Sequence, residues 1–437
     1  MKLANRMILT AGCIVLVIIS WAIVLNSKSA SQKQAELLAQ AQVYLDDLVY
    51  VTAIPLLEEA AGYDEARTLE AESALKNAYL QMLGQTEYQK KYVGLLEKQM
   101  NRKDASADVF DEAANFYLGN AKYSEAYTIL KNGIAKTGDE GLKALYENCR
   151  YEYNIAYNFY EDVSAIFGTT IGVKQDGLWG LASSDGSLLV PCEYDKISTF
   201  SDGRAIALKD GEITAIDGSN NRLVLFKGEA SDFGNYADGR VALLTDEGWK
   251  RATGDFQMGT MAFEQIGTHS NGHAAAKQGG KWGVVDISAE WAIPAEHDGV
   301  AMDELGRSYA QGAAFVKDGG QYRLFVDGAQ VGGAYDDAKP FGDEGFAAVR
   351  HGGKWGFIDT SGELRIGYRF DDALSFGQHL AAVRIGNFWK YISLSGEIAI
   401  DAEFLQAKSF ANGSAPVLTE RGWQFITLVE SRKGVSL

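Results

Sequence analysis

Few residues in this sequence have the types and spacing that chemistry needs. His269 and His273 form an HxxxH pattern, the spacing at which two imidazoles on one helical face bind zinc in metalloproteases. Here Ser270, Asn271 and Gly272 separate the two histidines, and these residue types favour a turn. A turn would not place both rings on one helical face, so we predict no metal site.

Acidic residues are plentiful but show no catalytic pattern. The pairs Asp336-Asp337 and Asp371-Asp372 resemble calcium loops in composition, yet they lack the alternating DxDxDG spacing and the distal Glu. We expect them to cap turns. The sequence contains no GxSxG, P-loop or Rossmann fingerprint, and no carboxylate pair stands out as glycosidase-like. We therefore predict no catalytic residue, no cofactor, and a protein that is not an enzyme.

A motif built around Trp is the most regular feature of the chain. It reads F-x-x-G-x-A-x-V, a Gly turn, x-W-G-x-I-D, a second Gly turn, and an apolar run ending near Tyr/Phe-Asp. Successive copies are separated by 34, 36, 33, 40, 33, 34 and 34 residues. Six of the eight Trp lie on this register, so the spacing belongs to the repeat. The register positions, which we predict to be structural anchors, are Trp179, Ile213, Trp249, Trp282, Tyr322, Trp355, Trp389 and Trp423.

Each part of the motif has a physical role. Alternating runs such as Ala347-Ala348-Val349 are typical of strands, and Gly352-Gly353 supplies the positive φ that a tight hairpin needs. The Trp buries a large ring, and the Gly that follows it, as at Gly356, leaves room for a neighbouring ring or backbone. One repeat is thus predicted to be three short strands, with about eight repeats over residues 164–430.

Eight such units could close into a ring or stack openly. Closure removes exposed strand edges, whereas an open β-solenoid needs a cap at each end. The last copy stops after its second strand, so the first strand of the array could complete the final turn of the ring. We favour an all-β propeller-like ring, with an open β-solenoid as the alternative.

The repeats resemble the WG-repeat (KWG) family of bacterial proteins. KWG itself stands at Lys281-Trp282-Gly283 and at Lys354-Trp355-Gly356, and the resemblance extends over residues 164–430. The copies at Ile213 and Tyr322 lack Trp, and in three other copies Lys or Gln follows the aromatic residue. The resemblance implies repeated β-hairpins with interaction roles and no defined reaction.

Residues 30–163 have a helical composition, since only eight of the 48 glycines precede residue 166. Tyr50, Tyr88 and Tyr123 begin three stretches of similar spacing, each expected to open the second helix of a pair. Breaks are expected at Ala61-Gly62, near Asn101-Arg102 and at Thr137-Gly138. The third stretch resembles a tetratricopeptide repeat: Tyr123, Ala126, Leu130 and Gly133 occupy its aromatic and small positions. This TPR-like solenoid has an unrelated array of helical hairpins as its alternative.

Residues 1–29 are predicted to be a transmembrane signal anchor. Met7 to Leu25 carries no charge and approaches the length that spans about 30 Å of hydrocarbon. Lys2 and Arg6 precede it, which favours a cytoplasmic N-terminus, extracytoplasmic C-terminal domains and a single-pass cell-membrane protein. A cleaved signal peptide and a lipoprotein box at Cys13 are the alternatives.

Composition limits the partners. The formal net charge of −17 disfavours nucleic acid, whose phosphates attract Lys and Arg. Only three Cys are present, so a disulfide framework is excluded, and pairing of Cys149 with Cys192 stays open. Residues 431–437 form a tail.

Two repeat classes in tandem favour a membrane-anchored extracytoplasmic scaffold that binds protein partners. A carbohydrate or cell-wall binding module is the alternative, and an enzyme with an unrecognised site is the second alternative. Exposure of the Trp side chains distinguishes the scaffold from the carbohydrate-binding module, because a sugar-binding platform needs exposed aromatic rings. We expect the register Trp to be buried.

Overall fold

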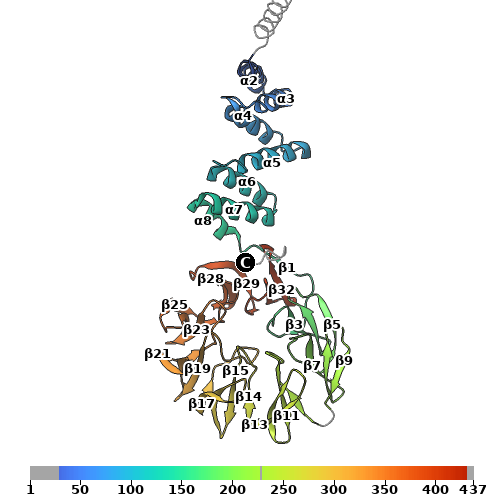
Figure 1. Cartoon of the computed structure of the whole chain (residues 1–437), viewed down its shortest axis with the longest axis vertical. Helices are drawn as coiled ribbons and strands as arrows, with labels where there is room; N and C mark the ends of the chain where they lie inside the picture. Colours follow the sequence, from blue (N-terminus) through green and yellow to red (C-terminus); the bar gives the residue numbers. More distant parts are fainter. Residues whose placement is uncertain (1–28, 227–228, 431–437) are drawn as a thin grey trace, which may run out of the picture. The chain divides into compact units, whose positions relative to one another are not determined.

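The computed structural model describes residues 29–226 and 229–430, which divide into two units between Leu145 and Tyr146 (Figure 1). Over these residues the first unit is helical, and the second consists almost entirely of short antiparallel strands. The helices are α2 (Ala30–Asp46), α3 (Tyr50–Ala61), α4 (Thr68–Leu80), α5 (Thr86–Met100), α6 (Ala107–Gly119), α7 (Tyr123–Thr137) and α8 (Glu140–Cys149).

The helix boundaries follow local capping chemistry. Ser29 begins α2 with a capping box, in which its hydroxyl accepts from the Gln32 N–H and the Gln32 side chain accepts from the Ser29 N–H. Gly138 ends α7 in the left-handed conformation at φ 68°. The breaks predicted after Ala61, near Asn101 and at Thr137 are confirmed.

Close approach of α6, α7 and α8 depends on Gly133. A Cβ at this position would lie 2.8 Å from both the Phe110 and the Leu142 side chains, so only glycine fits without a shift. This agrees with the predicted packing role of the small position. The structure shows helices in this region, and the TPR-like assignment itself stays a prediction.

No helix within residues 29–226 and 229–430 is long and apolar enough to cross a membrane. The longest, α2, has 17 residues and carries charged and amide side chains, whereas a membrane-spanning helix needs about 20 apolar residues. The prediction of a fold with a transmembrane helix, and of a single-pass membrane localisation, is therefore corrected. The stretch Met7 to Leu25 on which it rested lies outside the described residues.

Eight four-stranded sheets, the blades, form a ring in the second unit (Figure 1). Blade 1 is β2 (Asp162–Val163), β3 (Thr170–Gln175), β4 (Leu178–Ser183) and β5 (Leu188–Tyr194); blade 2 is β6 (Lys196–Ile197), β7 (Arg204–Lys209), β8 (Glu212–Asp217) and β9 (Arg222–Leu225). Blade 3 is β10 (Asp232–Phe233), β11 (Arg240–Thr245), β12 (Gly248–Thr253) and β13 (Met258–Phe263); blade 4 is β14 (Gln265–Ile266), β15 (His273–Gln278), β16 (Lys281–Asp286) and β17 (Trp291–His297).

The remaining blades repeat this order. Blade 5 is β18 (Gly299–Val300), β19 (Ala313–Asp318), β20 (Gln321–Val326) and β21 (Ala329–Tyr335); blade 6 is β22 (Asp337–Ala338), β23 (Phe346–His351), β24 (Lys354–Asp359) and β25 (Leu364–Phe370). Blade 7 is β26 (Asp372–Ala373), β27 (Leu380–Ile385), β28 (Phe388–Ser393) and β29 (Ile398–Phe404). Blade 8 is β30 (Gln406–Ala407), β31 (Ser414–Thr419), β32 (Gly422–Leu428) and β1 (Tyr153–Ile155).

Strand β1 closes the ring, because it precedes blade 1 in sequence yet pairs with β32 of blade 8. Tyr153 lies opposite Leu428 and Ile155 opposite Ile426 in an antiparallel register. The predicted propeller ring is confirmed. The closing strand, however, lies before residue 164, in the stretch predicted to be helical, because the helices end at Cys149 and the strands begin at Tyr153. The prediction of three strands per repeat is wrong, because each blade begins with a further strand that is only two residues long in this structure.

The Gly after the register Trp is required by the neighbouring strand. In blade 6 the register shifts between Trp355 and Phe357, where β25 bulges over β24. A Cβ at Gly356 would lie 2.6 Å from the Ile366 carbonyl oxygen, and Gly180 and Gly283 show the same approach at 2.4 Å to a backbone oxygen. In the Trp-Gly pair, the Trp thus supplies a large side chain for packing, and the Gly leaves space for the backbone of the outer strand.

The Lys of the KWG motif connects consecutive blades. Lys354 of blade 6 pairs at 2.5 Å with Asp371, which directly precedes β26 of blade 7, and Asp371 also accepts from the Gly386 N–H in the next hairpin turn. Lys281, Asp298 and Gly319 repeat this arrangement between blades 4 and 5. Asp371 therefore caps a turn, as predicted for the Asp pairs. The ion pair is exposed, so screening by solvent leaves it a weak contribution to stability.

Blade 5 contains an insertion. Residues 301–312 separate β18 from β19, whereas only residues 374–379 separate the equivalent strands of blade 7. The Leu305 carbonyl accepts from Asn235 Nδ2 of blade 3 at 2.9 Å and from Thr268 Oγ1 of blade 4 at 2.5 Å. Glu304 pairs with Lys408 of blade 8 at 2.9 Å, so the insertion reaches across the ring.

Candidate binding surface

The eight register residues lie on the third strand of eight separate blades, so the structure does not bring them together into one site. Ile213, Trp355 and Trp423 are buried, while Trp179, Trp249, Trp282, Tyr322 and Trp389 are partly exposed. The burial expected of the register Trp is therefore complete in two blades and partial in four.

Basic side chains lie over several register rings. Lys174 Nζ lies 5.7 Å from the centre of Trp179, and Lys408 Nζ lies 5.2 Å from the centre of Trp423. These are cation–π distances, and the Lys stem covers ring surface that a sugar would otherwise contact. Among the partly exposed rings, Trp179 and Tyr322 thus each have a Lys over one face.

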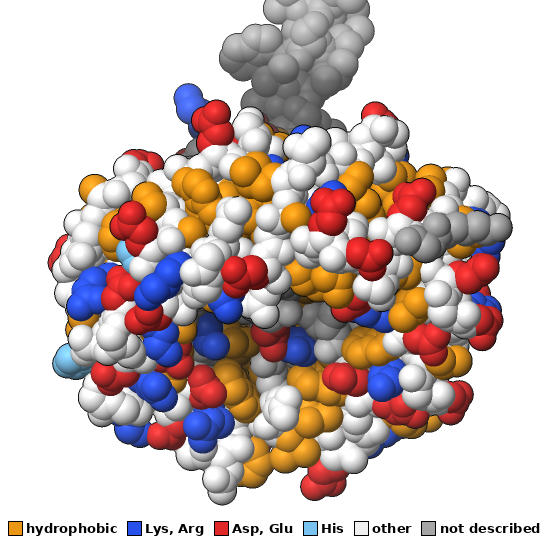
Figure 2. Space-filling view, turned by 90° about the horizontal axis from the view of Figure 1, so that it is seen from below, with side chains coloured by type: hydrophobic (Ala, Val, Ile, Leu, Met, Phe, Trp, Pro, Cys, Tyr) orange, Lys and Arg blue, Asp and Glu red, His pale blue; other side chains and the backbone are white. Residues whose placement is uncertain are grey.

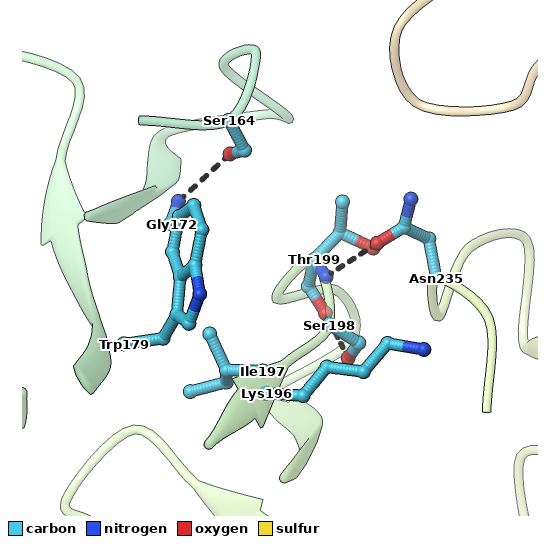
Figure 3. A pocket seen from close by; sticks show the side chains of 8 residues that line it. All are labelled: Ser164, Gly172, Trp179, Lys196, Ile197, Ser198, Thr199 and Asn235. Carbon is cyan, nitrogen blue, oxygen red and sulfur yellow. Dashed lines mark hydrogen bonds between the residues drawn. The ribbon is translucent and has the colours of Figure 1, made fainter. Parts of the chain in front are cut away.

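One cavity of ≈ 240 Å³ lies where blades 1, 2 and 3 meet (Figure 3). The ring of Trp179 faces Ile197 across this space, and Ser198 and Asn235 close another side (Figure 3). The full lining is Ser164, Gly172, Trp179, Lys196, Ile197, Ser198, Thr199 and Asn235. The cavity is slightly smaller than the roughly 300 Å³ at which small-molecule sites begin.

Polar groups around this cavity are occupied by the protein itself. Ser164 Oγ accepts from the Gly172 N–H and donates to the Ala165 carbonyl. Asn235 Oδ1 accepts from the Thr199 N–H, while its amide nitrogen donates to the insertion in blade 5. Because these donors and acceptors are already paired, the cavity offers few groups to a polar ligand.

An exposed aromatic and basic cluster lies beside the closing strand. Tyr157 is 83% exposed and Phe159 is 47% exposed, both in the segment that follows β1. Arg421, in the hairpin turn between β31 and β32, lies 5.2 Å from the centre of Tyr157 and 5.5 Å from that of Phe159. We call these three residues the closure cluster.

Exposed apolar side chains also lie on the outer strands of blades 7, 8 and 1. Ile398 of blade 7, Ile155 of blade 8 and Leu188 of blade 1 are each about half exposed. These strands are the last in the order of each sheet, so one of their edges has no strand partner. The face seen in Figure 2 shows hydrophobic side chains among Lys, Arg, Asp and Glu.

The sequence motifs considered for metal binding do not form a site. His269 is buried, whereas His273 stacks on Tyr309 with ring centres 4.0 Å apart. Within the described ranges no group of three or more His, Cys, Asp or Glu could hold a metal ion. Cys149 and Cys192 are not bonded to each other, and burial raises the pKa of Cys149 to about 11.

Sequence reasoning missed the closure cluster, although a signal was present. Residues 151–160 carry five aromatic residues and no Gly, which differs from both the helical segment and the repeats. Because this stretch lay before the first Trp, it was assigned to the helical segment. Its partner Arg421 is 264 residues away from Tyr157 in sequence, and only closure of the ring brings them together.

A family model described as "WG containing repeat" matches residues 179–212, 333–355 and 355–389. This supports the β-repeat part of the predicted resemblance. No match was found among curated proteins.

Solved structures with a similar fold are distant. YCF48 from Cyanidioschyzon merolae is 13% identical, with a TM-score of 0.34 over 63% of this chain and 98% of that chain. The WD40 domain of SCAP from fission yeast is 6% identical, with a TM-score of 0.36 over 64% and 98%. The Neurospora crassa Pan2 WD40 domain is 8% identical, with a TM-score of 0.34 over 61% and 88%. None of these likenesses bears on function.

Proposed function

We propose that this protein is a scaffold that binds protein partners, and that the closure cluster is its principal contact. The eight-bladed propeller fits a general binding role, since β-propellers are commonly involved in protein–protein interactions. The single observation that carries the proposal is the exposed group of Tyr157, Phe159 and Arg421.

The composition of the closure cluster supports a protein partner. Tyr and Arg are enriched among the residues that dominate binding energy at protein interfaces, where aromatic anchors enter pockets of the partner. Tyr157 has the exposure that such an anchor needs, and the guanidinium of Arg421 lies over its ring. Ile398, Ile155 and Leu188 add exposed apolar side chains on blades 7, 8 and 1.

Binding of a cell-wall glycan is less well supported. Trp355 and Trp423 are buried, and Lys174 covers part of Trp179. The cavity beside Trp179 has its polar groups paired internally. An enzymatic role has no residue that favours it, so we propose a protein without catalytic activity.

Co-purification with matched variants tests the scaffold proposal. The full chain, the Tyr157→Ala/Phe159→Ala variant and the Ile287→Ala variant are expressed in the native host, and the bound proteins are quantified. Ile287 is 44% exposed on blade 4 and serves as the control. We expect a defined set of proteins to bind the full chain and the control, and to drop at least about tenfold with the double variant.

Circular dichroism of each variant checks that the ring has folded. Equal recovery of the same proteins by all three chains would show that the closure cluster is not the contact. Recovery of no protein above background by the full chain would contradict the scaffold proposal itself.

A further inference from the structure

The seam between blades 3 and 4 differs from every other seam at one position of the third strand. Two residues after the register position, seven blades carry an apolar side chain that is buried. Blade 3 carries Arg251 there, and it is only half-buried. The seven buried residues are Leu181, Ala215, Val284, Leu324, Phe357, Tyr391 and Phe425.

The facing position on the following blade also changes. It lies in the loop after the first strand and is aromatic in most blades, for example Phe376 and Phe410. Phe357 packs against Phe376 with ring centres 4.9 Å apart, and Tyr391 packs against Phe410 at 4.8 Å. Blade 4 carries His269 at this position.

A polar pair thus stands at this seam, whereas the seams between blades 6 and 7 and between blades 7 and 8 have an aromatic pair. Arg251 Nη1 lies 3.4 Å from His269 Nε2 and donates to the Asp286 carbonyl at 2.8 Å. The apolar core of the seam is correspondingly small, with only Phe263, Ala276 and Val285 buried together in their cluster. A buried polar substitution with no gain in packing is the kind of local exception that marks a functional position.

Positive charge at the seam is not neutralised. Arg240 lies on the same face of blade 3 as Arg251, because Arg240 pairs with Thr253 and Ala242 pairs with Arg251 across the two strands. Within the described part of the chain, neither guanidinium has a carboxylate within 4.0 Å. In a chain with a net charge of −17, two such arginines side by side are unexpected.

His269 adds a hydrogen-bond donor without an acceptor. Because Arg251 can only donate, Nε2 of His269 must accept, and the proton of the neutral ring then resides on Nδ1. His269 is 4% exposed, and its Nδ1 has no partner in the structure. Burial and the two arginines both disfavour the charged ring and lower the pKa of His269 to about 3.

We propose that the seam between blades 3 and 4 binds an oxyanion, either a phosphate or a carboxylate, through Arg240 and Arg251. Guanidinium groups match the planar oxygens of both anions, and an anion would neutralise the two charges. His269, whose ring contacts Arg251 through Nε2, carries a further unpaired donor at its buried Nδ1. This site is independent of the closure cluster and of the scaffold function proposed above.

Isothermal titration of the full chain with inorganic phosphate, and separately with acetate, tests this site at constant ionic strength. We expect saturable binding of at least one anion, and the arm that binds more tightly identifies the oxyanion. The Arg240→Gln variant should weaken the affinity at least about tenfold, because it removes one charged donor. The Arg365→Gln variant is the control, since Arg365 is paired with Asp359 on blade 6.

The Arg251→Phe/His269→Phe variant rebuilds the aromatic pair seen at other seams, so it should fold and should not bind the anion. Retention of binding in this variant and in Arg240→Gln would place the anion elsewhere and overturn the proposal. Absence of saturable binding by the full chain for both anions would overturn it as well.

Discussion

At the scale of single residues, the glycine of the Trp-Gly pair is set by a backbone contact. The outer strand bulges over Gly356, and any Cβ there would meet the Ile366 carbonyl oxygen. Blade 7 carries Lys390 at this position, although its outer strand shows the same register shifts as that of blade 6. The register shift alone therefore does not require glycine, whereas the close approach of the Ile366 carbonyl at Gly356 does.

We expect Gly356→Ala to lower the free energy of unfolding by about 1–3 kcal/mol, because overpacking forces a backbone shift. Urea unfolding of the full chain measures this change. The control is Gly367→Ala, because a Cβ at Gly367 meets nothing within 4 Å. Equal effects of the two substitutions would show that the contact with Ile366 is not the cause.

Residue patterns indicated the motif but not every consequence of it. The position of the glycine directly after Trp predicted its role, and the pairs of adjacent glycines predicted the hairpin turns. The four-strand blade could not be read from the sequence, since a strand of two residues such as Asp372–Ala373 is too short to show a period. Similarly, Ala347, Ala348 and Val349 are all buried, because their strand lies between two blades. Both faces of this strand are covered, so the alternation of its side chains does not separate buried from exposed residues.

At the scale of elements, the gap of 40 residues between Trp282 and Tyr322 marks the insertion in blade 5. Its length was visible in the sequence, but its contacts with Asn235, Thr268 and Lys408 were not, because they arise only when distant blades face one another. The closure cluster was hidden for the same reason. Spacing within a repeat is local, whereas a surface between repeats depends on how the ring closes.

Strand β1 provides the closure, and its backbone can be tested directly. Asn154 lies opposite Thr427, between the hydrogen bonds from Val429 to Glu152 and from Ala156 to Phe425. This alternation makes Asn154 a hydrogen-bonded position. We expect Asn154→Pro to remove a ladder bond and to lower the urea midpoint, with faster hydrogen exchange in β32.

The matched control is Asn154→Ala, which changes the exposed side chain and keeps the backbone N–H. It should leave both the urea midpoint and the exchange of β32 close to those of the unmodified chain. If Asn154→Pro also leaves them unchanged, β1 is not needed to hold the ring closed.

At the scale of the whole molecule, the polar seam makes stability depend on pH. Burial is the main reason that protonation of His269 is disfavoured; Arg251, Arg240 and His273 disfavour it further and Asp286 favours it, with a net lowering of its pKa to about 3. The pKa in the unfolded chain is about 6.5. Between these values the unfolded state binds a proton that the folded state does not, so stability falls as pH decreases from about 6.5 towards 3.

We expect the titration of His269 to lower the free energy of unfolding by about 2 kcal/mol when the pH falls from 7 to 5. Urea unfolding at both values compares the full chain with His269→Phe, which lacks the titrating group. Carboxylates that titrate near pH 5 affect both chains alike, so the difference between the chains isolates His269. A difference that does not change with pH would contradict the role given to this histidine.

Closure by β1 also has a consequence for biosynthesis. Tyr153 leaves the ribosome long before its partner Leu428, since 275 residues separate them. At roughly 5–20 residues per second, this interval lasts roughly 14 to 55 s. During that time blades 1 to 7 can form in order, while the nascent strand β1 and the apolar edge of blade 1 stay exposed. Translation of β32 therefore sets the time at which the newly made chain no longer exposes an unpaired strand edge to other chains.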